Sequence, residues 1–135
     1  MINGRKKGHD AERFIAKKLN DVINAVCDDW KRPRPIFPQV QRNQNQSAVG
    51  GLDLVGTLIF GIEIKRCQKP AIKTWWKQVE AAADVEDKEP VLIYKIDRGA
   101  WLVCMNASIH NEVYRVTIPF DSFIDIFAKE FEQSF

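Results

Sequence analysis

The sequence predicts a single α/β domain in which a mixed central β-sheet is flanked by helices. Three observations lead to this prediction. The chain has 135 residues, the usual length of one domain. Hydrophobic residues make up 45% of it, which is enough for a core and excludes a disordered chain. Finally, helical and strand periodicities follow one another in the order helix, strands, helix, strands, helix, so that residues 1–135 are expected to form one domain.

A long amphipathic helix is expected first, over residues 10–26. Apolar residues recur there at spacings of three and four, which is typical of one helical face, and Asp10 is a suitable N-cap. Residues 27–38 contain three prolines and a basic cluster, and they are expected to form a loop. A short strand over residues 36–42 and a polar loop over residues 43–51 follow.

Strands are expected next over residues 52–55 and 60–65. The second alternates apolar and polar side chains, which is typical of a strand with two different faces. Because the two strands follow one another closely, we expect them to pair as a hairpin. A helix is then expected over residues 72–83.

The C-terminal part of the chain predicts three more strands and a last helix. The strands are expected over residues 91–96, 101–105 and 112–118, with a Gly-containing turn between the first two. The final helix is opened by Pro119 and Asp121, and it carries a phenylalanine-rich face whose expected use is in the core.

Basic residues are concentrated in the N-terminal part of the chain. Residues 1–80 hold 15 Lys and Arg against 8 Asp and Glu, a net charge of +7, whereas residues 81–135 have a net charge of −5. This asymmetry is consistent with a polyanionic partner such as nucleic acid, and equally with an ordinary solvated face.

Other classes of protein are excluded by what the sequence lacks. No segment approaches the ~20 apolar residues of a membrane span, and no apolar segment follows the basic N-terminus as in a secretory signal. The three cysteines are widely spaced, which argues against a disulfide framework or a zinc site and favours a cytoplasmic protein. The motifs of ATPases, dinucleotide-binding enzymes, serine hydrolases and zincins are absent.

Three acidic residues interrupt the hydrophobic pattern. Glu12 falls on the apolar side of its helix, where a charge is costly unless it is paired or binds a metal. Its position near a helix N-terminus offers another explanation, because the positive end of the helix dipole favours a carboxylate there. Asp53 and Glu63 are each flanked by apolar residues, and each alone could be on a solvent-facing side of a strand. On a paired hairpin they would share one face with Lys65, and two carboxylates beside an ammonium suit Mg²⁺ and a polarised water.

These residues also carry a family resemblance. Gly51-Leu52-Asp53, followed ten residues later by Glu63-Ile64-Lys65, resembles the signature of PD-(D/E)XK nucleases, with Leu52 in place of the nominal proline. The N-terminal Arg5-Lys6-Lys7-Gly8 and the helix opening Ala11-Glu12-Arg13 resemble the start of archaeal-type Holliday-junction resolvases. The resemblance covers over half of the chain.

The resemblance implies a restriction-endonuclease-like fold and a function in DNA recombination or repair. The expected enzyme is a Mg²⁺-dependent endodeoxyribonuclease, with Mn²⁺ as a substitute, that hydrolyses phosphodiester bonds in four-way junctions or other branched DNA. It would be a cytoplasmic homodimer of prokaryotic or phage origin. Two alternatives stay open: a PD-(D/E)XK nuclease acting on flaps, ends or modified DNA, and a non-catalytic DNA-binding module.

The resemblance also implies roles for individual residues. Glu12, Asp53, Glu63 and Lys65 match catalytic positions, and the expected metal ligands are the three carboxylates and the Ile64 carbonyl. DNA contacts are expected from a serine in the loop after the short strand and from a set of basic residues: Ser47, Arg5, Lys6, Lys7, Arg13, Lys31, Arg32, Arg34 and Arg42.

The second expected helix contains three further residues of interest. Gln78 lies where related nucleases often place an auxiliary glutamine, although an ordinary polar flank explains it equally well. Trp75 and Trp76 fit the core better than a base-stacking platform, because large aromatic side chains usually bury their area.

Overall fold

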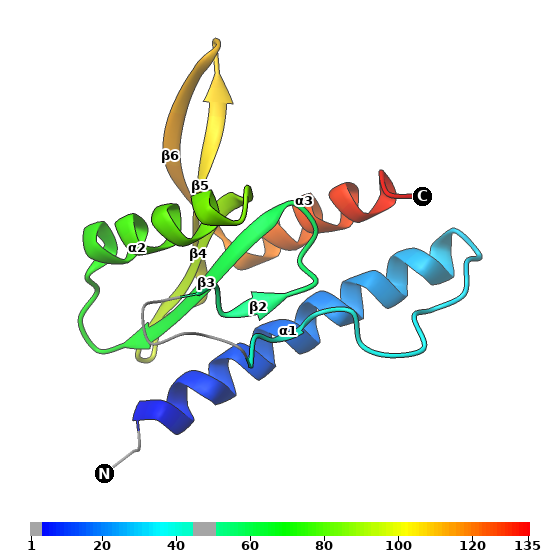
Figure 1. Ribbon diagram of the computed structural model, residues 1–135, viewed down its shortest axis with the longest axis horizontal. Coiled ribbons are helices and arrows are strands. Elements are labelled where there is room, and N and C mark those ends of the chain that lie inside the picture. Colours follow the sequence, from blue (N-terminus) through cyan, green and yellow to red (C-terminus); the bar gives the residue numbers. More distant parts are fainter. Residues whose placement is uncertain (1–3, 45–50) are drawn as a thin grey trace.

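The computed structural model describes residues 4–44 and 51–135, and side chains from residue 8 onward within the first helix (Figure 1). The elements in chain order are α1 (Gly4–Asp29), β1 (Gln41–Arg42), β2 (Leu54–Val55), β3 (Phe60–Cys67), α2 (Ile72–Val85), β4 (Glu89–Ile96), β5 (Leu102–Ile109), β6 (Glu112–Pro119) and α3 (Phe120–Glu132). The predicted order of helices and strands is therefore confirmed.

The main sheet has four strands in the order β3-β4-β5-β6. β3 and β4 are parallel and are connected through α2, whereas β4, β5 and β6 pair antiparallel. A parallel pair needs a crossover connection, and here the helix supplies it. The prediction of an α/β domain with a mixed sheet is confirmed.

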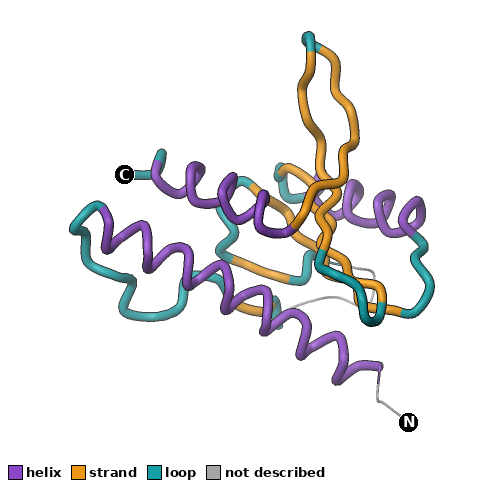
Figure 2. The backbone as a smooth tube through the Cα atoms, turned by 180° about the vertical axis from the view of Figure 1, so that it is seen from behind, coloured by secondary structure: helices purple, strands orange, loops and turns teal. Residues whose placement is uncertain are grey.

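Helices cover both faces of this sheet (Figures 1 and 2). On one face α1 and α3 pack over the strands, and fully buried Phe123 and Phe127 of α3 meet Phe60 of β3. On the other face α2 contributes Trp76 and Val79 to a smaller cluster. Trp76 is 6% exposed, so its predicted place in the core is confirmed.

The first helix begins earlier and ends later than the sequence predicts. It runs from Gly4 to Asp29, so Asp10 is an interior residue and not the N-cap. The Asp10 carboxylate accepts a hydrogen bond from Arg13 on the helix surface. Residues 4–9 contain no proline or β-branched residue, and lysine and arginine are good helix formers, so the helix extends through them.

The expected hairpin between residues 52–55 and 60–65 is wrong. β2 pairs with β1, with Gln41 opposite Val55, while β3 pairs with β4. Gly56 explains the divergence: its φ is +76°, and a Cβ there would lie 2.0 Å from the carbonyl oxygen of Gln39. Only glycine permits this close approach between the end of β2 and the segment that leads into β1.

The expected strand over residues 36–42 is also shorter in the structure, where it covers only Gln41–Arg42. Pro35 and Pro38 each remove a backbone donor from the segment before it, which explains the late start.

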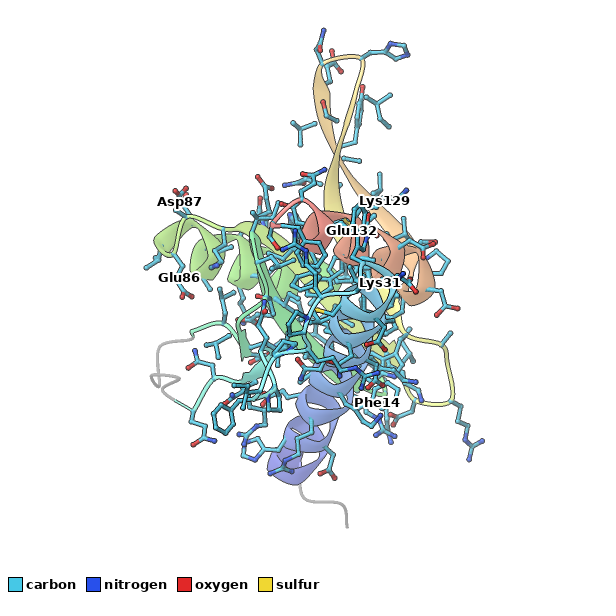
Figure 3. All side chains as sticks on the ribbon, turned by 90° about the vertical axis from the view of Figure 1, so that its right-hand side faces the viewer. Phe14, Lys31, Glu86, Asp87, Lys129 and Glu132 are labelled. Atoms are coloured by element: carbon cyan, nitrogen blue, oxygen red, sulfur yellow. The ribbon has the colours of Figure 1, made fainter. Side chains whose placement is uncertain are left out.

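The β5–β6 hairpin projects from the body of the domain (Figures 1 and 3). The two strands pair from Leu102 opposite Pro119 out to Ile109 opposite Glu112, whereas β4 pairs only as far as Met105. Its tip residues His110 and Asn111 have φ values of 52° and 65°, as a tight hairpin turn requires. Within the described residues, no helix is long and apolar enough to cross a bilayer.

Candidate active site

The strand β3 directs two charged side chains to the α2 side of the sheet. Phe60, Ile62 and Ile64 point into the core with α1 and α3. Because side chains alternate along a strand, Glu63 and Lys65 lie on the opposite face. Glu63 is only 6% exposed, so it is buried and does not lie on an open strand face.

Asp53 is fixed beside β3 by two hydrogen bonds. Its backbone N–H donates to the carbonyl oxygen of Ile62 at 3.0 Å, and its carboxylate Oδ2 accepts the N–H of Ile64 at 2.7 Å. The N–H and C=O of one strand residue point to the same side. The Ile64 carbonyl is therefore directed toward the edge of β3 where Asp53 lies.

Glu12 reaches the same region from α1. It is 7% exposed, in agreement with its predicted place on the apolar helical face. Its Oε2 accepts a hydrogen bond of 2.8 Å from Nε of Arg42 in β1, and both side chains are largely buried. Arg42 in turn is opposite Leu54 in β2, next to Asp53. The small β1–β2 sheet thus connects Glu12 to the Asp53 segment.

Electrostatic interactions link Glu63 to Asp53, Lys65 and Glu12. Its pKa is raised to about 7, first by burial and then by the negative charge of Asp53. The ammonium group of Lys65, 3.7 Å from Oε2 of Glu63, opposes this rise, and the charge of Glu12 adds a further small increase. The structure therefore brings Glu12, Asp53, Glu63 and Lys65 into one interacting group.

The oxygen atoms of this group suit a hard cation. Among the described residues, no three Asp, Glu, His or Cys side chains form a ready-made metal cage. Mg²⁺ does not need one, because it commonly binds through one or two carboxylates and keeps several waters. Asp53, Glu63 and the Ile64 carbonyl could supply such a partial set of ligands.

The comparison with known protein families agrees with this geometry. Residues 3–132 match the model of a family described as "Phage putative PDDEXK endonuclease". The chain belongs to this PD-(D/E)XK endonuclease family. No curated protein matches the sequence. Because of the family match, the domain is a nuclease with DNA as its substrate, and its fold is consistent with the restriction-endonuclease-like fold. Nucleases of this superfamily typically depend on divalent metal ions.

The basic residues expected to contact DNA are spread along the nuclease. Arg13 is exposed on α1, next to Glu12, and pairs with Asp10. The cluster of residues 31–34 follows the C-terminal end of α1, and that end lies roughly 25 Å from Glu12 along the helix axis at 1.5 Å per residue. Figure 3 labels Phe14 on α1 and Lys31, which lies beyond the C-terminal end of this helix. The structure does not bring that cluster beside the carboxylates.

Several of these side chains already have partners in the nuclease. Arg34 donates to the Asp28 carboxylate at 2.9 Å, and the resulting ion pair lowers the pKa of Asp28. The Arg32 guanidinium lies 4.4 Å from the ring centre of Phe135. Arg42, predicted as a phosphate contact, is instead the partner of Glu12.

The remaining expected residues of the nuclease are less closely tied to the carboxylates. Gln78 is exposed on α2. Trp75 is half-buried against Tyr94, with 6.2 Å between ring centres. Ser47 lies outside the described residues, as do the side chains of Arg5, Lys6 and Lys7, whose backbone begins α1.

One positioning residue of the nuclease was not found from the sequence. The Nδ2 amide group of Asn20 donates a hydrogen bond to the Val40 carbonyl at 2.8 Å, and Oδ1 of Asn20 accepts one from the Val40 N–H at 2.9 Å. This double contact fixes β1, and with it Arg42, against α1. An asparagine on a helix gives no signal of a partner 20 residues away, so only the tertiary structure reveals it.

Removing the charge of Glu63 is expected to stabilise the metal-free nuclease at high pH. The folded pKa of Glu63, about 7, exceeds its ordinary value of 4.5, so folding binds a proton. Stability is therefore lost as the pH rises from about 4.5 to about 7. In EDTA, Glu63→Gln should raise the unfolding free energy at pH 8 by on the order of 1–2 kcal/mol, with little change near pH 4.5. Urea unfolding at both pH values measures this, and an equal effect at both would contradict it.

Proposed function

We propose that this nuclease is a Mg²⁺-dependent endodeoxyribonuclease that hydrolyses phosphodiester bonds in branched DNA, such as four-way junctions. The observation that carries the catalytic part is the hydrogen bond from Ile64 N–H to Asp53 Oδ2, because it fixes Asp53 beside Glu63 and Lys65. Glu63 and Lys65 are on β3 and Asp53 comes from the segment before it, and the hydrophobic core does not use their charged groups. A non-catalytic module would have no need to keep a buried carboxylate such as Glu63.

In this proposal, Asp53, Glu63 and the Ile64 carbonyl hold the metal ion. When bound, Mg²⁺ would polarise the phosphate and lower the pKa of a bound water. Lys65 is one-third exposed and lies beside Glu63, so its ammonium group can orient the attacking water or offset negative charge that develops on the phosphate oxygens. Glu12, held by Arg42, completes the site directly or through a water.

The preference for branched DNA rests on the N-terminal resemblance and on symmetry. A four-way junction offers two equivalent strands, and a homodimer with one isologous interface would place two sites around a two-fold axis. The positive charge of residues 1–80 suits the dense phosphates of such a substrate. Function in DNA recombination or repair belongs to the same proposal.

A cleavage panel tests this function. The protein is incubated with a four-way junction, a flap, a splayed arm and a linear duplex, each with Mg²⁺, Mn²⁺ or EDTA. With either metal we expect cleavage of the junction, with paired cuts on opposite strands. In EDTA we expect no cleavage. Cleavage that persists in EDTA would contradict the metal site, and faster cleavage of the linear duplex would contradict the preference for branched DNA.

A further inference from the structure

A groove of about 620 Å³ lies between α1 and the segment that leads into β1. Its floor includes Ala16 and Ile23 of the helix, and its outer wall is the loop of residues 35–39. The volume is within the range of ligand-binding clefts. Arg13 and Arg42, two of the predicted DNA contacts, line the groove, and the other lining residues have been assigned no ligand.

Among the described residues, the polar lining of the groove consists of positive and amide side chains and includes no acidic ones. Arg13, Lys17 and Arg42 contribute the charge, and Asn24, Gln39 and Gln41 contribute amides. Arg13 and Lys17 pair with carboxylates that are not part of the lining, and both pairs are exposed to solvent. Exposed ion pairs of this kind contribute little, so both cations are able to exchange their partners for phosphate.

The outer wall presents an aromatic side chain to solvent. Phe37 is 77% exposed and its neighbour Ile36 is 92% exposed, although both line the groove. Pro35 and Pro38 flank the pair and restrict the loop backbone. An exposed ring in a restricted loop beside cations and amides is suited to stack against a flat, polar ligand that carries phosphate.

The groove is continuous with the candidate active site through Arg42. This residue lines the groove and also donates to Glu12, and Arg13 is the neighbour of Glu12 on α1. A strand lying in the groove would therefore pass Arg42, the residue that contacts Glu12 of the candidate active site. Duplex DNA keeps the faces of its bases stacked on one another, whereas an unpaired nucleotide can present a base face to Phe37.

We propose that this groove binds an unpaired segment of the DNA substrate, with Phe37 stacked on a base and Arg13 and Lys17 at phosphates. The inference rests on the proposed nuclease function and adds that, among branched substrates, those with an unpaired segment next to the cleavage site are bound more tightly than fully paired ones. Flaps and splayed arms are then better substrates than fully paired duplexes. Phe37 determines this specificity and is not a catalytic residue.

The test compares Phe37→Ala with the unmodified protein in binding experiments without Mg²⁺. Fluorescence anisotropy with a labelled splayed arm, a 12-nucleotide single strand and a linear duplex gives the affinity for each. We expect Phe37→Ala to weaken binding of the two unpaired ligands about tenfold, as the loss of one base–aromatic stack does, and to leave duplex binding unchanged. Phe37→Trp should restore the affinity.

Tyr114→Ala is the matched control, because Tyr114 is an aromatic residue, 47% exposed, on the projecting hairpin. It should bind all three ligands normally. Normal binding of unpaired DNA by Phe37→Ala, or an equal loss for duplex, would overturn the proposal, and so would capture of an apolar peptide in place of DNA. Because binding is measured without metal, an absence of cleavage would contradict the nuclease function and leave this result intact.

Discussion

Lys65→Ala is expected to lower the rate of DNA cleavage by about 10²–10³, the usual cost of losing one group that stabilises developing charge. Its ammonium group lies 3.7 Å from Glu63 and its side chain is one-third exposed, so the core does not depend on it. The fold and the affinity for DNA should therefore be nearly unchanged. Single-turnover cleavage with enzyme in excess measures the rate, and anisotropy without Mg²⁺ measures the affinity.

Lys73→Ala is a matched control for this prediction. Lys73 is exposed in the first turn of α2, and its loss removes the same charge from the same region of the chain. The control should cleave at the normal rate. If Lys65→Ala cleaves as fast as the Lys73 variant, the assignment of Lys65 to the site is wrong, whereas a loss in both would indicate a general effect of charge.

Phe127→Ala is expected to give the largest loss of stability, about 3–5 kcal/mol of unfolding free energy, as is typical for a fully buried phenylalanine. The Phe127 side chain has no exposed area and packs against Phe60 and Phe123, with 6.3 Å between ring centres in each pair. Removing the ring leaves a cavity beneath β3. Urea unfolding followed by circular dichroism measures the change.

The neighbouring Ile126→Ala is the control, because Ile126 is on the same helix but 37% exposed. Its effect should be well below that of the phenylalanine, about 1 kcal/mol or less. Equal effects of the two substitutions would contradict the packing of α3 onto the sheet.

Local periodicity was sufficient to predict the main elements of the fold. The alternation of Phe60, Ile62 and Ile64 identified β3, and the spacing of the phenylalanines identified the buried face of α3. The catalytic assignment could be made because the spacing of Asp53, Glu63 and Lys65 resembles a nuclease signature, whereas the hairpin expected to bring Asp53 beside Glu63 is wrong. That assignment still stands as a prediction, although the structure places the residues together.

Contacts between distant segments could not be predicted in the same way. Arg42 pairs with Glu12 across 30 residues, and Asn20 holds Val40 across 20. Both contacts depend on how β1 packs against α1, which no local pattern specifies. The pairing of β2 with β1 has the same origin, since a two-residue strand takes its partner from the surrounding packing.

The position of α3 makes activity depend on synthesis of the chain as far as this helix. All proposed catalytic residues lie between Glu12 and Lys65, but the buried side of their strand is covered by the phenylalanines of a helix that begins at Phe120. Synthesis from the N-terminus therefore exposes the whole catalytic set before the helix that supports β3 exists. A chain cut short before Phe120 carries every catalytic group without a stable strand to hold them, so unfinished or truncated copies would be poor nucleases inside the cell that makes them.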